Sequence, residues 1–171
     1  MTDYLPLRPS SLSHEEFIDA YGGIYEHSPW VAEKVWQLHM RFTVDRPASL
    51  HFAMKQIVDG AGEEKQLALL CAHPDLAGKL ALAGELTAES TAEQMSAGLD
   101  LCTEAEFEEL QALNKLYREK FGFPFIIAVR GLTRTDIIES FRLRVHHDRE
   151  TEFATALAEV HKIALLRLKN L

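Results

Sequence analysis

The sequence has little that would mark a secreted, membrane or nucleic-acid-binding protein. Its 171 residues include only two cysteines, Cys71 and Cys102, which lie among apolar neighbours and are expected to be reduced, buried thiols. No apolar run approaches the length of about 18 residues that a membrane-spanning helix needs. The net charge is -8 and the basic residues are scattered, so no nucleic-acid partner is expected. Together with the lack of a signal-peptide pattern, these absences predict a cytoplasmic protein with no membrane partner.

Familiar catalytic motifs are missing as well. The chain has no glycine-rich phosphate loop and no nucleophile elbow. It contains eight histidines, but no two of them have the i, i+4 spacing of a helical pair of metal ligands. The sequence therefore predicts no metal site.

The sequence does contain many residues that typically begin or end helices, and convincing strand alternation is scarce. A length of 171 residues with 47% apolar and 26% charged residues suits one soluble globular domain. Residues that suit helix N-caps recur along the chain, three of them with the capping-box spacing. These are Ser13 with Glu16, Ser90 with Glu93, Thr103 with Glu106, and the single caps Thr135 and Asp148. We predict an all-α fold, a single-domain bundle of about eight or more helices spanning residues 1–171.

The pair His73-Pro74 is the most constrained histidine in the sequence. Proline disfavours α conformation at the residue before it, and Pro74 suits the first position of a helix. The pattern therefore predicts an imidazole held at a helix entrance, where it can exchange a proton near neutral pH. Taken alone, such a pair is more often an ordinary loop histidine.

Two further stretches can be read as structural or as functional. The segment Ser90 to Gln94 either only caps its own helix, or presents backbone N–H groups and the Glu93 carboxylate to a ligand. The segment Phe121 to Val129 is predicted to be extended backbone in the core. It either plugs that core with phenylalanines, or lines a pocket with backbone groups that a small heterocycle could pair with.

Arg167 stands out on the last helix. It lies on a face with Phe153, Leu157, Val160 and Ala164, which are all apolar. A guanidinium on such a face needs either a carboxylate of the protein or an anionic, planar ligand, unless its side chain reaches out to solvent at the end of the helix.

Four motifs in this order resemble one known family. They are Ala-His-Pro-Asp-Leu-Ala, Ser-Thr-Ala-Glu-Gln, Leu-Asn-Lys-Leu-Tyr-Arg-Glu-Lys-Phe-Gly-Phe-Pro-Phe-Ile and a terminal Lys-Ile-Ala-Leu-Leu-Arg-Leu. The chain resembles the decarboxylases of 2-oxo-4-hydroxy-4-carboxy-5-ureidoimidazoline (OHCU) from about Ser13 to Leu171. The resemblance implies an all-helical homodimer that uses no cofactor and converts this small molecule, derived from urate, to (S)-allantoin and carbon dioxide.

The resemblance also implies roles for individual residues. His73 and Glu93 would be catalytic, with His73 as the proton donor and Glu93 accepting hydrogen bonds from the substrate. The implied substrate-binding set is Pro74, Ser90, Thr91, Ala92, Glu93, Gln94, Phe125, Ile126, Ile127, Ala128, Val129 and Arg167. No metal or Schiff base is needed, because the imidazolinone ring is its own electron sink.

Three alternatives stay open at this point. His73 could first act as a base on the substrate hydroxyl. The protein could instead be a hydrolase of a related ureide, with His73 and Glu93 activating water. It could also be a helical interaction module without catalysis, in which His73, Glu93 and Arg167 are only cap and core partners.

Overall fold

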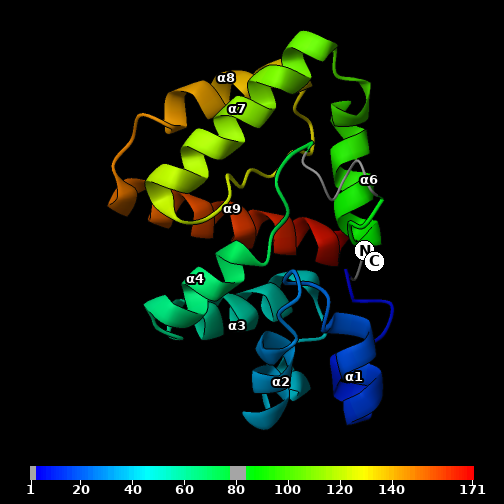
Figure 1. The fold of residues 1–171 in the computed structure, drawn as a ribbon. Coiled ribbons are helices and arrows are strands. Elements are labelled where there is room, and N and C mark those ends of the chain that lie inside the picture. Colours follow the sequence, from blue (N-terminus) through cyan, green and yellow to red (C-terminus); the bar gives the residue numbers. More distant parts are fainter. Residues whose placement is uncertain (1–2, 78–83) are drawn as a thin grey trace. The chain divides into compact units, whose positions relative to one another are not determined.

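The fold was analysed in a computed structural model, which describes residues 3–77 and 84–171 (Figure 1). The described residues form eight α-helices and three short 3-10 helices, without a β-strand. They divide into two compact units, residues 1–72 with 160–171 and residues 73–159. The all-α prediction is confirmed.

The first unit contains four helices and the end of a fifth. They are α1 (His14–Tyr21), α2 (Trp30–Gln37), α3 (Pro47–Asp59), α4 (Glu63–Cys71) and the part of α9 (Arg149–Lys169) from Val160 onward, with the 3-10 turns η1 (Pro9–Ser11) and η2 (Met40–Thr43). Helix α2 packs against α1 and α3. Apolar side chains at helical spacing, such as Val31 and Val35 of α2 and Leu50 and Met54 of α3, are fully buried between them.

The second unit is built around the long helix α7 (Glu104–Phe121). The other elements are α6 (Ala88–Ser96), η3 (Leu99–Leu101), α8 (Arg134–Arg144) and the part of α9 up to Glu159. Tyr117 of α7 lies at the centre of an aromatic cluster, with its ring 4.5 to 5.9 Å from the rings of four phenylalanines. These are Phe121, Phe123, Phe125 and Phe141.

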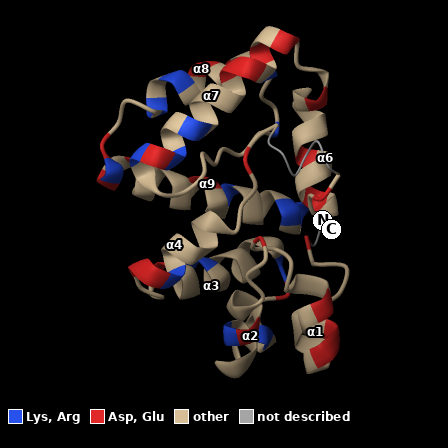
Figure 2. Ribbon diagram, viewed as in Figure 1, with Lys and Arg blue, Asp and Glu red and all other residues tan. Residues whose placement is uncertain are grey.

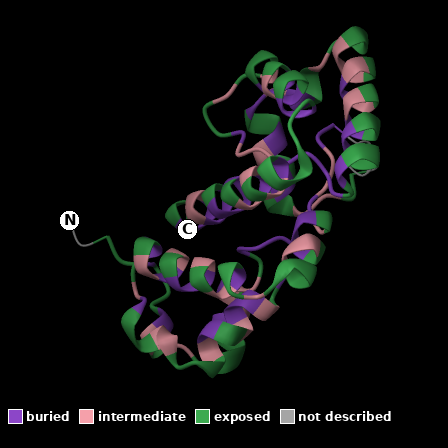
Figure 3. Cartoon of the chain, turned by 90° about the vertical axis from the view of Figure 1, so that its left-hand side faces the viewer, coloured by how far each residue is buried: buried purple, intermediate pink, exposed green. Residues whose placement is uncertain are grey.

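The charges of α7 follow the helix dipole. Acidic residues occupy the first turn of α7 and basic residues its last turn, and Figure 2 shows this change of colour along the helix. Figure 3 shows buried positions on one side of the helices and exposed positions on the other. Among the described residues, no helix is both long and apolar enough to cross a membrane.

Several predicted helix caps are confirmed. Ser13 and Thr103 form complete capping boxes at the starts of α1 and α7. The Asp148 carboxylate accepts the Thr151 N–H at 2.8 Å at the start of α9. Helix α7 ends at Gly122, whose φ of 81° is the left-handed conformation that favours glycine.

Other local predictions were wrong. Helix α8 is capped by Thr133, which forms a capping box with Asp136, and not by Thr135. Cys71 is exposed and Cys102 is half-buried, so neither is the buried thiol that its apolar sequence neighbours suggested. Cys71 is the last residue of α4, and its side chain turns away from the face that buries Leu69 and Leu70.

Candidate functional site

His73 follows α4 and is buried, with 6% of its surface exposed. Pro74 and Asp75 after it are not helical, and Leu76 and Ala77 form a turn. Pro74 is therefore not the first residue of a helix, as the sequence suggested, but part of an irregular loop.

Side chains from α6 and α7 hold this loop by its backbone. Asn114 donates to the Leu76 carbonyl at 3.0 Å, and Gln111 donates to the Ala77 carbonyl at 2.7 Å. Gln94 accepts the Ala77 N–H at 3.0 Å. We call these three residues the amide clamp. A loop whose backbone groups are paired in this way keeps one conformation, and this fixes the chain immediately after His73.

The amide clamp also explains an unusual backbone angle. Ala77 has a φ of 48°, a left-handed conformation that costs a residue with a Cβ atom about 1 to 2 kcal/mol. Such a conformation persists where its surroundings over-determine it. Here the N–H and the carbonyl of Ala77 are both bound by clamp side chains.

Helix α6 begins earlier than predicted. Its N-cap is Thr87, whose hydroxyl accepts the Ser90 N–H at 3.2 Å, so the predicted capping box of Ser90 and Glu93 is wrong. Ser90 lies inside the first turn with its side chain buried. The orphan N–H groups of this helix start therefore lie closer to residue 87 than the sequence suggested.

The predicted binding residues on α6 fall into three groups by exposure. Ser90 and Gln94 are buried, Glu93 is half-buried, and Thr91 and Ala92 are exposed. A cavity of about 610 Å³ adjoins this helix, and its lining includes Thr91, Gln94 and Ala77. Gln94 thus connects the cavity with the loop that follows His73.

The segment Phe125 to Val129 is irregular, extended backbone without strand pairing, as predicted. The Phe125 ring stacks on Phe141 at 3.9 Å and meets Tyr117 edge-on at 5.5 Å. Ala128 donates its N–H to the Glu159 carboxylate at 2.8 Å. Helix α7 therefore supports both predicted segments, the His73 loop through Gln111 and Asn114 and the extended segment through Tyr117.

Arg167 belongs to the first unit, where it is buried and paired. Its Nη2 atom lies 2.8 Å from Oε2 of Glu26, and the two residues are 7% and 2% exposed. The carboxylate partner that the sequence required is therefore Glu26, and Arg167 does not reach out to solvent. Sequence analysis missed Glu26, because no local pattern connects residues so far apart in the chain.

Two more acidic residues, Glu152 and Glu159, also escaped sequence analysis. They lie seven residues apart on α9 on either side of the buried Ala156, and both are buried. An inward-facing pair at this spacing is a signal that could have been recognised, because buried carboxylates need partners. Among residues 3–77 and 84–171, no three His, Cys, Asp or Glu side chains are gathered as a metal site would require.

Comparison with known proteins identifies related sequences over most of the chain. A family model described as OHCU decarboxylase matches residues 10–169. The chain is 48% identical over 157 residues to a 2-oxo-4-hydroxy-4-carboxy-5-ureidoimidazoline decarboxylase of Haloferax volcanii, covering 92% of this chain and 89% of that protein. It is 38% identical over 165 residues to the protein of the same name from Mus musculus, covering 96% and 91%.

Solved structures agree with these matches. A crystal structure of (S)-allantoin synthase aligns with a TM-score of 0.74 at 38% identity, covering 94% of this chain and 51% of that one. This chain therefore corresponds to about half of the synthase. A crystal structure of OHCU decarboxylase in the presence of (S)-allantoin aligns with a TM-score of 0.68 at 22% identity, covering 89% and 96%, and shows similarity of fold.

Proposed function

Because this chain belongs to the OHCU decarboxylase family, we propose that it decarboxylates OHCU to (S)-allantoin in urate degradation. The observation that carries this proposal is 48% identity over 92% of the chain to a protein of that name. The family match at residues 10–169 includes parts of both compact units, which supports the prediction that residues 1–171 act as one decarboxylase domain.

In the proposed reaction, the bond from a ring carbon to the carboxylate breaks and carbon dioxide leaves. The electron pair of that bond enters the conjugated imidazoline ring, so the substrate itself accepts it. His73 then donates a proton to the ring carbon that becomes the stereocentre of allantoin, while the substrate hydroxyl becomes a carbonyl and its proton passes to a ring nitrogen. Delivery of that proton to one face sets the S configuration. The amide clamp supports this role, because it fixes the loop that begins at His73.

The other predicted residues orient the substrate. Glu93 accepts hydrogen bonds from ureido or ring N–H groups, and Ser90 to Gln94 line the same side of the ligand. Backbone N–H groups of Phe125 to Val129 bind a ring carbonyl and the negative charge that develops on it. Arg167 binds a substrate oxygen. Fixed orientation of this kind can contribute several kcal/mol to the rate.

The test is to generate the substrate from urate with a urate oxidase and a hydroxyisourate hydrolase, add the protein, and follow (S)-allantoin by circular dichroism. We expect a fast signal from the wild type. For His73→Ala we expect the rate to fall by about 100-fold or more, in line with the loss of a general acid. His146→Ala, which removes an exposed histidine, is the matched control and should behave as wild type.

Product analysis separates the competing functions. Release of ammonia or a ring-opened acid without carbon dioxide would indicate a ureide hydrolase and contradict the proposal. A wild type that yields only the slow racemic background would contradict it as well, and would favour a non-catalytic interaction module. A turnover profile that falls at both low and high pH would indicate that His73 also acts as a base.

Two further properties belong to this proposal. The resemblance supports a homodimer, which light scattering during size-exclusion chromatography would reveal as twice the chain mass of 19.3 kDa. A cytoplasmic location is supported by Cys71 and Cys102, which are not joined in a disulfide, as suits a reducing compartment.

A further inference from the structure

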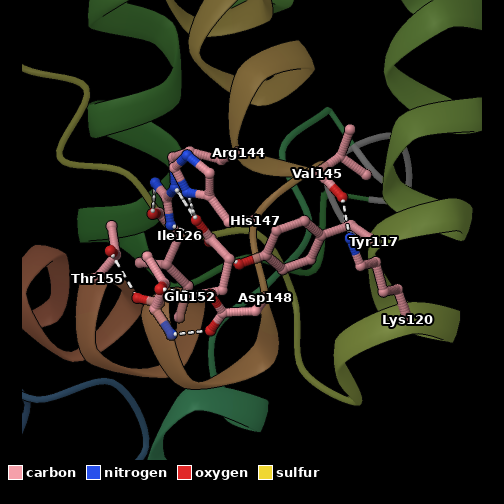
Figure 4. Close-up of polar contacts among 10 residues, drawn as sticks. Tyr117, Lys120, Ile126, Arg144, Val145, His147, Asp148, Glu152 and Thr155 are labelled. Carbon is pink, nitrogen blue, oxygen red and sulfur yellow. Dashed lines mark hydrogen bonds and ion pairs between the residues drawn. The ribbon is translucent and has the colours of Figure 1, made fainter.

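A buried polar network contacts the extended segment of residues 125–129. At its centre is Glu152 of α9, which is fully buried and accepts hydrogen bonds from three side chains (Figure 4). Arg144 donates to it from Nε at 3.1 Å and from Nη2 at 2.9 Å. His147 contacts it through Nδ1 at 3.0 Å, and the Tyr117 hydroxyl donates to it as well. Burial, reinforced by Glu152, raises the pKa of the Tyr117 hydroxyl, which keeps this donor protonated.

Such a network is a poor way to stabilise a core. Desolvating a carboxylate and a guanidinium costs several kcal/mol for each ion, and a well-packed apolar pair often does as well or better. The side chains of Arg144 and Glu152 are only 8% and 0% exposed. Their presence in the aromatic core of the second unit therefore calls for a role other than stability.

The guanidinium of Arg144 has a second target. While Nε and Nη2 bind Glu152, Nη1 donates to the Ile126 carbonyl at 2.8 Å. The same guanidinium lies 4.3 Å from the centre of the Phe125 ring, within cation–π distance. One rigid, planar group thus holds the ring of one residue and the carbonyl of the next.

A second buried carboxylate completes the arrangement. Glu159, two turns after Glu152 on α9, accepts the Ala128 N–H at 2.8 Å. Arg144 and Glu159 therefore bind the Ile126 carbonyl and the Ala128 N–H, the backbone groups on either side of Ile127. No hydrogen bond of the Ile127 backbone occurs within the described parts of the chain. Fixing the two outer residues therefore leaves the middle peptide groups oriented for a ligand.

We propose that Arg144 and Glu152 are positioning residues of the decarboxylation, which fix the Ile126 carbonyl and so orient the backbone that binds the substrate. This inference rests on the proposed function for its catalytic consequence. Arg144 touches the segment, Glu152 holds Arg144 in place, and Tyr117 and His147 hold Glu152. None of these four side chains needs to touch the substrate.

The first variant to test is Arg144→Lys. A lysine keeps the positive charge beside Glu152, but its single ammonium group cannot reproduce the planar fork that serves Glu152 and Ile126 together. We expect kcat/KM to fall about 10-fold or more, together with a loss of (S)-enantiomer excess, because a loosely held ring can be protonated on either face. Arg142→Lys is the matched control, since Arg142 lies on the same helix in an exposed ion pair with Glu109.

A purely structural role would give a different pattern. Arg144→Lys would then lower the thermal midpoint, but the folded fraction would retain the KM and the enantiomer excess of Arg142→Lys. That result would overturn the inference. Tyr117→Phe guards against misfolding, because it removes only a hydroxyl from Glu152, and it should show a smaller change in the same direction.

Amide hydrogen exchange tests the structural part without any turnover. In the wild type the Ala128 N–H is bound to Glu159, and we expect its exchange to accelerate about 10-fold in Arg144→Lys but not in Arg142→Lys. Unchanged exchange would overturn the inference whatever the activity of the wild type. Failure of the proposed function would instead appear as a wild type that makes no (S)-allantoin.

Discussion

The buried pair of Arg167 and Glu26 makes a quantitative prediction for the variant Glu26→Gln. The substitution keeps the size of the side chain but removes the charge that lies 2.8 Å from the guanidinium. Breaking a buried ion pair costs about 3 to 5 kcal/mol, because the remaining charge is left uncompensated. The amide oxygen of glutamine can still accept a hydrogen bond, which favours the lower end of this range. At about 2 to 4 °C per kcal/mol for a chain of this size, the thermal midpoint should fall by roughly 10 °C.

The assay is thermal unfolding followed by far-ultraviolet circular dichroism. The matched control is Glu33→Gln, the same substitution in the same unit, where Glu33 forms an exposed pair with His14. Exposed pairs contribute about 0 to 1 kcal/mol, so the control should shift by at most about 4 °C. Equal shifts for the two variants would refute the reasoning, because the Glu26 carboxylate would then not offset the buried charge of Arg167.

A double variant separates stability from function at the same place. Glu26→Leu with Arg167→Met replaces both charges by apolar groups, and such replacements of buried pairs are often neutral or stabilising. We expect the thermal midpoint to return to within a few degrees of wild type, while (S)-allantoin formation is lost because Arg167 no longer binds the substrate. Full activity of the double variant would remove Arg167 from the proposed binding set.

Two further predictions concern pH and the amide clamp. Burial is the main cause that lowers the pKa of His161 in the folded protein below its ordinary value of about 6.5. As the pH falls through this value, the unfolded chain therefore binds more protons than the folded protein. The free energy of unfolding should therefore fall as the pH drops from about 7.5 to about 5.5, by up to about 1.4 kcal/mol per pH unit for this group. In His161→Gln the free energy of unfolding, measured by urea titration at several pH values, should depend less steeply on pH. The variant Gln111→Leu removes the donor to the Ala77 carbonyl. It should cost about 1 kcal/mol of stability and lower kcat/KM about 10-fold in the allantoin assay, and unchanged kinetics would show that the clamp does not position His73.

Local chemistry made part of the fold predictable from the sequence. At α7 the capping box of Thr103 and Glu106, the acidic first turn and Gly122 all indicate the same helix, and the structure has it. At α6 two residues suited to the N-cap, Thr87 and Ser90, lie three positions apart. Either could accept a backbone N–H, and the choice depended on the burial of Ser90, which is a tertiary property. The same ambiguity shifted the start of α8 from Thr135 to Thr133.

The candidate site was predictable only in part, for a related reason. Periodicity alone showed that Arg167 lies on an inward face, and this required a partner. It could not name Glu26, because pairing between distant residues leaves no periodic trace. The amide clamp was missed because the side chains of Gln111 and Asn114 bind backbone groups of the loop. Every residue has a backbone carbonyl, so the loop residues that accept these hydrogen bonds cannot be recognised from the sequence.

The polar residues in the core follow from how a helical protein can recognise a small heterocycle. Backbone groups inside a helix are already paired, so donors and acceptors for a ligand have to come from irregular segments. In the proposed site these are the loop after His73 and the extended segment of residues 125–129, and within the described residues no strand pairs with either of them. Side chains have to replace the missing strands, and the amide clamp, Arg144 and Glu159 do so. These side chains hold the irregular segments and add little to the stability of the core. An apolar replacement can therefore preserve the fold and still lower activity.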